Sequence, residues 1–210
     1  KDDRFDTIRS VWWKWALFWS TQITWVWVVS LPVTFIVATH TNKALSAVDY
    51  VGWSIFGLAL LLETVADYQK LTFNKSKQPG EKKFIQTGLW RNSRHPNYFG
   101  EIFVWLGIWL SSSYGLWEID TAYGVLGLFS PVFTFVLLAF VSGIPPAEQR
   151  DDKRFGDMPE YVEYKKRTSP LWFFPCSLYA KMPMLLRKVP FVVIYDYTKL
   201  QNRPAENEEQ

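Results

Sequence analysis

A short stretch, His95 to Glu101, holds the side chains of this chain best suited to proton chemistry. Its imidazole, amide and carboxylate are those of His95, Asn97 and Glu101. Because Asn97 and Glu101 are four residues apart, they project from the same face of a helix. A carboxyl group in apolar surroundings favours its neutral form, which can donate a hydrogen bond or a proton to a carbonyl oxygen.

The basic residue before this stretch adds a place for an anion. Arg94 stands at the expected entrance of a helix, where free backbone N–H groups also attract phosphate. These features predict an anionic cofactor on the cytosolic side and a lipid-soluble substrate entering from the bilayer. Two other interpretations stay open. Arg94 and its neighbours can bind lipid head groups, and Glu101 can serve to pair helices.

A second pair of carboxylates precedes this stretch. Glu63 and Asp67 are four residues apart, at the far end of an apolar segment. On a helix they share one face. The spacing alone leaves open whether they form a solvated rim or line a polar cavity.

Four apolar segments must position these residues. Each approaches the length needed to cross about 30 Å of hydrocarbon at about 1.5 Å per residue. The aromatic share of 18% is high, and Trp residues crowd the start of the first segment, as they do at membrane interfaces. The sequence predicts an all-α, multi-pass transmembrane helix bundle with about four spans here and further spans upstream of Lys1. The predicted spans are 15–38, 48–66, 98–114 and 122–144.

The distribution of basic residues predicts the topology. The 67–97 loop and the chain after 146 are rich in Lys and Arg, whereas the 40–47 and 112–121 loops share one lysine, Lys43. The positive-inside rule places both termini and the 67–97 loop in the cytosol. In a eukaryote the endoplasmic reticulum is the expected membrane.

The remaining composition narrows the possibilities. Residues 1–174 are expected to form the membrane domain, and 175–210 a cytosolic tail, partly interfacial, with a disordered acidic end. A net charge of +3 is too small to indicate nucleic acid, and nothing indicates an obligate protein partner. Two histidines and one cysteine, widely spaced, do not favour a metal site.

The stretch and its surroundings resemble a known family. Gly88-Leu89-Trp90, followed by Ser93-Arg94-His95-Pro96-Asn97-Tyr98-Phe99-Gly100-Glu101, is similar to the C-terminal domain of the steroid 5α-reductase family. The match is closest to the broad, largely uncharacterised branch of that family. The resemblance covers roughly residues 1–172. Within that range the further matching stretches are 66–70, 141–145, Glu148 and 161–168.

The resemblance implies an NADPH-dependent reduction of a carbon–carbon double bond in a lipid or steroid-like substrate. It implies that Asn97 contacts the nicotinamide and that Glu101 sits at the substrate carbonyl. By the same resemblance the other expected cofactor contacts are Asp67, Arg94, His95, Tyr98 and Glu148, and Trp105 is expected to form a wall of the substrate pocket.

Part of the motif has a second resemblance. The Arg94-His95-Pro96 turn is also similar to isoprenylcysteine carboxyl methyltransferases, which use S-adenosylmethionine. The characterised reductases hold the carbonyl with an additional tyrosine from an earlier helix, and no residue of this chain matches it. A methyltransferase and a non-catalytic membrane protein that keeps the fold are therefore the alternatives. The pairing of Asn97 with Glu101 favours the reductase.

Overall fold

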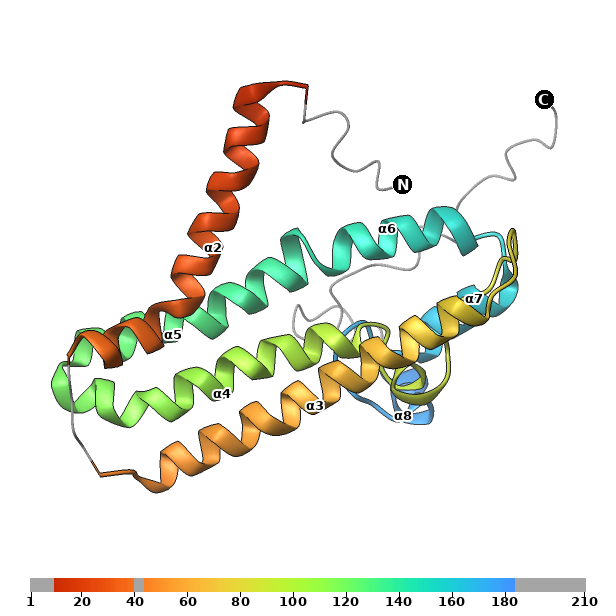
Figure 1. The fold of residues 1–210 in the computed structure, drawn as a ribbon. Helices are drawn as coiled ribbons and strands as arrows, with labels where there is room; N and C mark the ends of the chain where they lie inside the picture. The colour runs from red at the N-terminus through yellow and green to blue at the C-terminus, as the bar shows by residue number, and fades with distance from the viewer. Residues whose placement is uncertain (1–9, 40–43, 184–210) are drawn as a thin grey trace. The chain divides into compact units, whose positions relative to one another are not determined.

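The described part of the protein is helical, as predicted. A computed structural model describes residues 10–39 and 44–183 (Figure 1). Within these ranges no β-strand forms, and one isolated bridge joins Ser93 to Ser169. The helices are α2 (Trp12–Ala38), α3 (Ala47–Ser76), α4 (Pro96–Ile119), α5 (Thr121–Val136), α6 (Ile144–Phe155), α7 (Pro159–Arg167) and α8 (Cys176–Lys181), with a 3-10 turn η2 (Gly88–Arg91) and a π-helical turn η3 (Leu137–Val141).

Three segments of the described chain are long and apolar enough to cross a membrane. They are α2, α3 and the continuous stretch Thr121–Phe155 that comprises α5, η3 and α6. The span predicted at 98–114 lies in α4, which has the necessary length at 24 residues but not the apolarity. Tyrosine, tryptophan and serine lower the hydropathy of α4. The three segments fit a multi-pass membrane protein.

Two loops are shorter than predicted. The predicted start of the 67–97 loop is too early in the sequence, because α3 continues to Ser76. The first strong helix-breaking residues after Asp67 are Pro79 and Gly80. The 112–121 loop is also wrong, because α4 continues to Ile119 and α5 begins at Thr121. Three consecutive serines are accommodated in α4, where Ser111, Ser112 and Ser113 donate to carbonyls one turn earlier.

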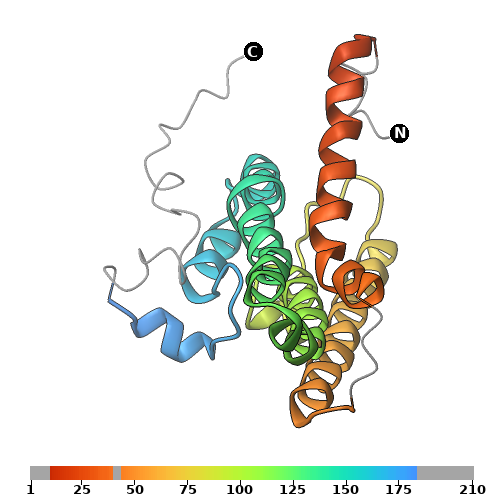
Figure 2. The ribbon, with the colours of Figure 1, turned by 90° about the vertical axis from the view of Figure 1, so that its left-hand side faces the viewer.

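Prolines shape two of the apolar segments. Pro32 lies inside α2, and the ribbon of α2 bends in its C-terminal part (Figures 1 and 2). Proline removes a backbone donor and clashes with the preceding turn, which bends a helix. Pro145 and Pro146 occupy the first turn of α6, where their missing N–H groups cost little.

The chain divides into two compact units. Unit 1 comprises Lys1–Ser54 and Trp105–Phe133, and unit 2 comprises Ile55–Val104 and Thr134–Gln210. In unit 1 the Ser130 hydroxyl donates to the Val29 carbonyl at 2.8 Å.

Unit 2 contains every predicted site residue except Trp105. Two clusters of buried side chains form its core: Ile102, Leu138, Ile144 and Leu171 in the first, and Phe155, Tyr161 and Tyr164 in the second.

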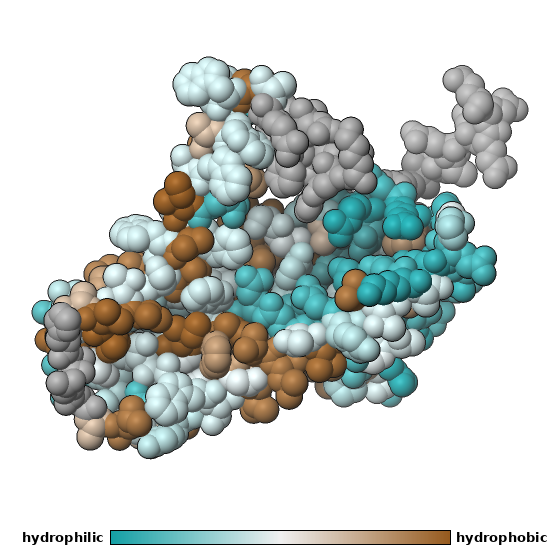
Figure 3. Space-filling view, viewed as in Figure 1, coloured by the Kyte–Doolittle hydropathy of each residue, from teal (hydrophilic) through white to brown (hydrophobic). Residues whose placement is uncertain are grey.

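The surface of unit 2 changes character along its length. On the face drawn in Figure 3, hydrophilic side chains gather over α6 and α7, and hydrophobic ones follow the middle of α3. The predicted tail begins at 175, and its first helix, α8, packs within unit 2 with Tyr179 only 1% exposed. Residues 184–210 lie outside the described chain.

Helices α3 and α4 approach closely in unit 2, and Gly100 permits this contact. A Cβ atom at Gly100 would lie 2.7 Å from the Glu63 Cβ and 3.0 Å from the Ala59 carbonyl oxygen. The absence of a side chain at Gly100 therefore brings the helix that carries Glu101 against Glu63.

We expect Gly100→Ala to lower the free energy of unfolding by about 1–3 kcal/mol, because the added methyl group forces the helices apart. Gly57→Ala is the matched control, since a Cβ at Gly57 meets nothing within 4 Å and alanine favours the helix by up to about 1 kcal/mol. Unfolding in detergent micelles measures both variants. Equal stability of the two would contradict the close contact.

Candidate functional site

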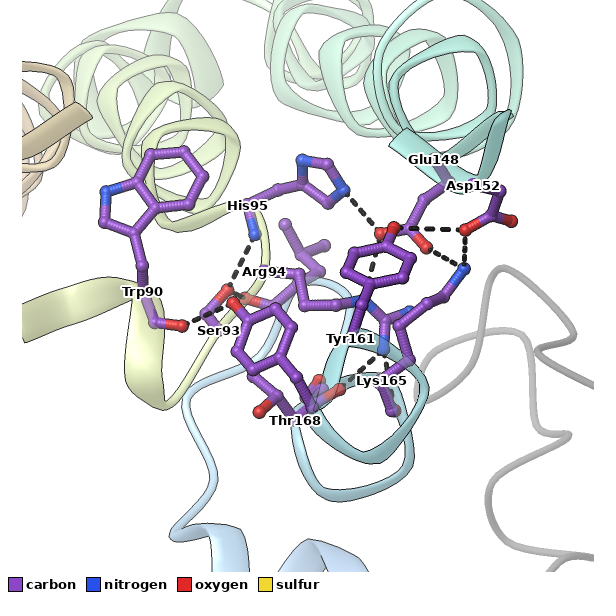
Figure 4. A network of polar contacts seen from close by, with 12 residues as sticks. Trp90, Ser93, Arg94, His95, Glu148, Asp152, Tyr161, Lys165 and Thr168 are labelled. Carbon is purple, nitrogen blue, oxygen red and sulfur yellow. Dashed lines mark hydrogen bonds and ion pairs between the residues drawn. The ribbon is translucent and has the colours of Figure 1, made fainter. Parts of the chain in front are cut away.

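A buried network of charged side chains organises unit 2 around Glu148 (Figure 4). One carboxylate oxygen of Glu148 accepts a hydrogen bond from the Arg94 Nε at 2.9 Å and lies 2.9 Å from the His95 Nε2. Its other oxygen lies 2.8 Å from the Lys165 Nζ. These side chains come from the turn before α4, from α6 and from α7, so Glu148 ties three elements together.

The network continues through Lys165 and Arg94. The Lys165 ammonium donates to Asp152 at 2.5 Å, and the Tyr161 hydroxyl donates to the same carboxylate oxygen at 3.0 Å. Arg94 Nη1 donates to the carbonyls of Lys165 and Thr168 at 2.9 and 2.7 Å. Two cations and two carboxylates therefore balance each other in the interior, which makes burial of all four tolerable.

The turn that carries Arg94 is fixed on every side. The Trp90 indole donates to the Ala66 carbonyl on α3 at 3.0 Å, and the Tyr164 hydroxyl donates to the Trp90 carbonyl at 2.5 Å. The Ser93 hydroxyl donates to the Leu171 carbonyl at 2.8 Å. The basic turn at the entrance of α4 is thus a packed part of the core.

The protonation of the network follows from its burial. Burial lowers the pKa of His95, against the opposing effect of its hydrogen bond to Glu148. The neutral imidazole then carries its proton on Nε2, which faces Glu148, and leaves Nδ1 as an acceptor. Burial alone would lower the pKa of Arg94, but the charge of Glu148 raises it. Burial raises the pKa of Tyr161 and of Tyr164, so both hydroxyls stay protonated.

A pocket of about 260 Å³ opens beside the network within unit 2. Residues of α3 at one-turn spacing line one side, and residues of α6 line another. Arg94, His95 and Glu148 contribute to its lining. Its charged residues are five cations and two carboxylates: Lys70, Lys77, Arg94, Arg150 and Arg154, with Glu148 and Asp151. Its aromatic residues are Phe73, Phe84, Trp90, Phe155, Tyr161 and Tyr164.

The pocket has an excess of positive charge. Arg94 is neutralised by Glu148 at 2.9 Å, and Arg150 lies 3.6 Å from Asp151. Lys70 lies over the Trp90 ring at 4.8 Å, a cation–π contact that leaves its charge in place. A pocket with this lining attracts anions.

A cluster of three carboxylates lies on α3 and α4 in the same unit. Glu63 and Asp67 are one turn apart on α3, and Glu101 directly follows Gly100, which packs against Glu63. Glu63 and Glu101 are half-buried, and Asp67 is exposed. The second carboxylate pair of the sequence therefore joins the predicted catalytic carboxylate.

Asn97 carries a buried polar atom that the protein leaves unsatisfied. Its side-chain oxygen has no hydrogen-bond partner among the described residues. An unmet buried acceptor costs about 1–3 kcal/mol, so a ligand that donates a hydrogen bond fits this position. Asn97 lies in the first turn of α4, one turn before Glu101.

The structure brings the predicted site residues together in part. Arg94, His95 and Glu148 line the pocket, and the His95 ring stacks on that of Tyr98 at 5.3 Å. Asp67, Asn97 and Glu101 lie outside the pocket lining, on the adjoining parts of α3 and α4. Trp105 follows Glu101 by one turn of α4 but belongs to unit 1, so its role as a pocket wall stays a prediction.

Sequence reasoning missed several residues of this site. Asp152 stands four residues after Glu148, and Lys165 four residues after Tyr161, a helical spacing that places each pair on one face. This spacing was the available signal for the inner network. The pocket residues Phe73 and Arg154 had no comparable signal.

The fold and the site define a multi-pass, all-α membrane protein with a buried ionic network beside a cationic pocket. The family described as "Protein of unknown function (DUF1295)" matches residues 1–168. The chain belongs to this family.

A curated relative is the Uncharacterized protein C594.04c of Schizosaccharomyces pombe. It is 27% identical over 130 residues, which cover 51% of this chain and 38% of the relative. The chain thus matches well under half of the length of that relative. No solved structure matches the chain.

Proposed function

We propose that the protein is a membrane-embedded, NADPH-dependent reductase of a carbon–carbon double bond in a lipid or steroid-like substrate. The observation that carries the proposal is the cationic, aromatic pocket of unit 2. Its unbalanced positive charge suits the phosphates of a nucleotide cofactor. The resemblance of the Gly88–Glu101 motif to the steroid 5α-reductase family supports the same reaction.

The residues beside the pocket fit such a cofactor. The buried, unsatisfied oxygen of Asn97 suits the amide donor of a nicotinamide. NADPH, when bound, supplies a hydride to the β-carbon of the conjugated double bond. A protonated Glu101 would give its proton to the substrate carbonyl oxygen as the hydride arrives. The resulting enol would take up a proton from water at its α-carbon and return the carbonyl proton to Glu101. The Glu148 network holds the turn before α4 and thereby the position of Asn97.

The charge of the pocket disfavours the methyltransferase alternative. S-adenosylmethionine carries a positive sulfonium centre, whereas NADPH carries several negative charges. Five cations against two carboxylates repel the first and attract the second. The charge of the pocket therefore favours NADPH over S-adenosylmethionine.

We expect the purified chain in lipid nanodiscs to bind NADPH at least about tenfold more tightly than S-adenosylmethionine, because only NADPH complements the pocket. Isothermal titration calorimetry measures both affinities. The NADPH affinity is expected to fall as salt rises, since part of it is electrostatic. Tighter binding of S-adenosylmethionine would contradict the reductase proposal and favour a methyltransferase. Binding of neither cofactor would favour a non-catalytic protein.

A further inference from the structure

Two cations converge on one aromatic ring at the outer end of the pocket. The Lys77 ammonium lies 5.9 Å from the centre of the Phe155 ring, and the Arg154 guanidinium lies 5.1 Å from it. Lys77 also lies 4.5 Å from the centre of the Phe73 ring. Lys77 directly follows α3 and Arg154 lies near the end of α6, so two separate elements supply the pair.

Carboxylates of the described residues offset these two charges only from a distance. By contrast, Lys82 pairs with Asp157 at 2.8 Å and Lys83 pairs with Glu81 at 2.5 Å. Neither Lys77 nor Arg154 takes part in a salt bridge within the described chain. Burial, and next the charge of Arg154, lower the pKa of Lys77, and the charges of Asp151 and Glu81 oppose this shift without reversing it. Two like charges held together cost free energy unless an anion joins them.

We propose that Lys77 and Arg154 form a subsite for a phosphomonoester. A phosphomonoester carries about −1.5 to −2 charges at pH 7, which two cations neutralise, whereas each phosphate of a diphosphate bridge carries about one. The guanidinium of Arg154 can bind two phosphate oxygens at once, and Lys77 adds a point charge.

The subsite gives the pocket a means of selection, which rests on the proposed function. NADPH differs from NADH by one phosphomonoester, the 2′-phosphate. Lys77 and Arg154 are therefore the residues that distinguish NADPH from NADH. A phosphomonoester is also the head group of phosphatidic acid. The membrane can supply this lipid at the polar end of unit 2.

The test uses the full chain in phosphatidylcholine nanodiscs and measures the affinities for NADPH and NADH. Lys77→Ala and Arg154→Ala are each expected to weaken NADPH binding by about 10- to 100-fold, since each removes a charge-assisted contact. NADH binding is expected to weaken by no more than about threefold, because NADH loses only the screened attraction of one pocket cation and no direct contact. Lys77→Arg is expected to restore most of the NADPH affinity.

Matched controls lie close to both residues in the sequence. Lys75 on α3 and Lys153 on α6 are exposed, and neither lines the pocket. Lys75→Ala and Lys153→Ala remove the same charge and are expected to leave both affinities within about twofold, because surface charges away from the site act weakly. An equal loss in the controls would overturn the subsite, since it would show a general effect of net charge.

The remaining outcomes separate the subsite from the proposed function. Equal binding of NADPH and NADH by the unchanged chain would overturn the subsite and leave the reductase proposal intact. Binding of neither would overturn the reductase proposal. In that case the binding of short-chain phosphatidic acid, compared with short-chain phosphatidylcholine as control, tests whether the subsite exists. Binding of phosphatidic acid that both Lys77→Ala and Arg154→Ala lose would assign the subsite to a lipid phosphomonoester. If phosphatidic acid does not bind, the subsite proposal is wrong.

Discussion

Replacing Glu148 by alanine is expected to destabilise the protein by about 3–5 kcal/mol, enough to unfold much of unit 2. Glu148 is 2% exposed and contacts Arg94, His95 and Lys165. Without it, two buried cations face one remaining carboxylate, that of Asp152. An uncompensated buried charge costs far more than the pair itself contributes. Thermal unfolding in detergent micelles, followed by tryptophan fluorescence, measures the loss.

The control is an ion pair of similar distance on the surface. Asp157 contacts Lys82 at 2.8 Å, with side chains 64% and 59% exposed. Asp157→Ala is expected to cost less than about 1 kcal/mol, because solvent screens an exposed pair. Two variants of equal stability would contradict the buried network. Glu148→Gln tests the charge itself, since the amide keeps the volume and leaves Arg94 without its counter-charge.

The fold was largely predictable from the sequence, because its signals are local. Runs of apolar residues fix where α2, α3 and α5 lie, and their length relates directly to the thickness of a bilayer. The errors concern the ends of helices. Asp67 to Ser76 look polar enough for a loop, yet they continue α3 because no proline or glycine interrupts them.

The contacts of the site were less predictable, because they join distant residues. Glu148 lies 54 residues from Arg94 in the sequence, and nothing in either neighbourhood identifies the other as its partner. A buried arginine and an exposed one look the same in a sequence. The family resemblance assigned Arg94, His95 and Glu148 to cofactor binding, and the structure adds that they bind one another.

The network and the candidate chemistry are linked through one helix start. Arg94 and His95 immediately precede α4, and Asn97 and Glu101 lie in its first turns. Fixing the turn by Glu148 also fixes the direction in which α4 begins. The loss of Glu148 is therefore expected to reduce both stability and cofactor binding, whereas a change at Glu101 is expected to affect only the reaction.

Replacing Glu101 by glutamine is expected to lower turnover by about 10²- to 10⁴-fold, the usual contribution of an acid that acts in the transition state. The amide keeps the size of the side chain but cannot deliver a proton. NADPH affinity is expected to stay within about twofold, because in the proposed reaction Glu101 contacts the substrate carbonyl and not the cofactor. Oxidation of NADPH in the presence of a steroid enone measures turnover, and calorimetry measures affinity.

Glu118→Gln is the matched control for this experiment, because Glu118 is exposed near the other end of α4. It makes the same chemical change and is expected to keep the turnover of the unchanged chain. Unchanged turnover in Glu101→Gln would exclude Glu101 as the acid, and Glu63, which adjoins it across the contact at Gly100, would be the next residue to test. A loss of NADPH affinity would instead place Glu101 in the cofactor site. Separate measurements of affinity and turnover therefore distinguish a proton donor from a binding residue.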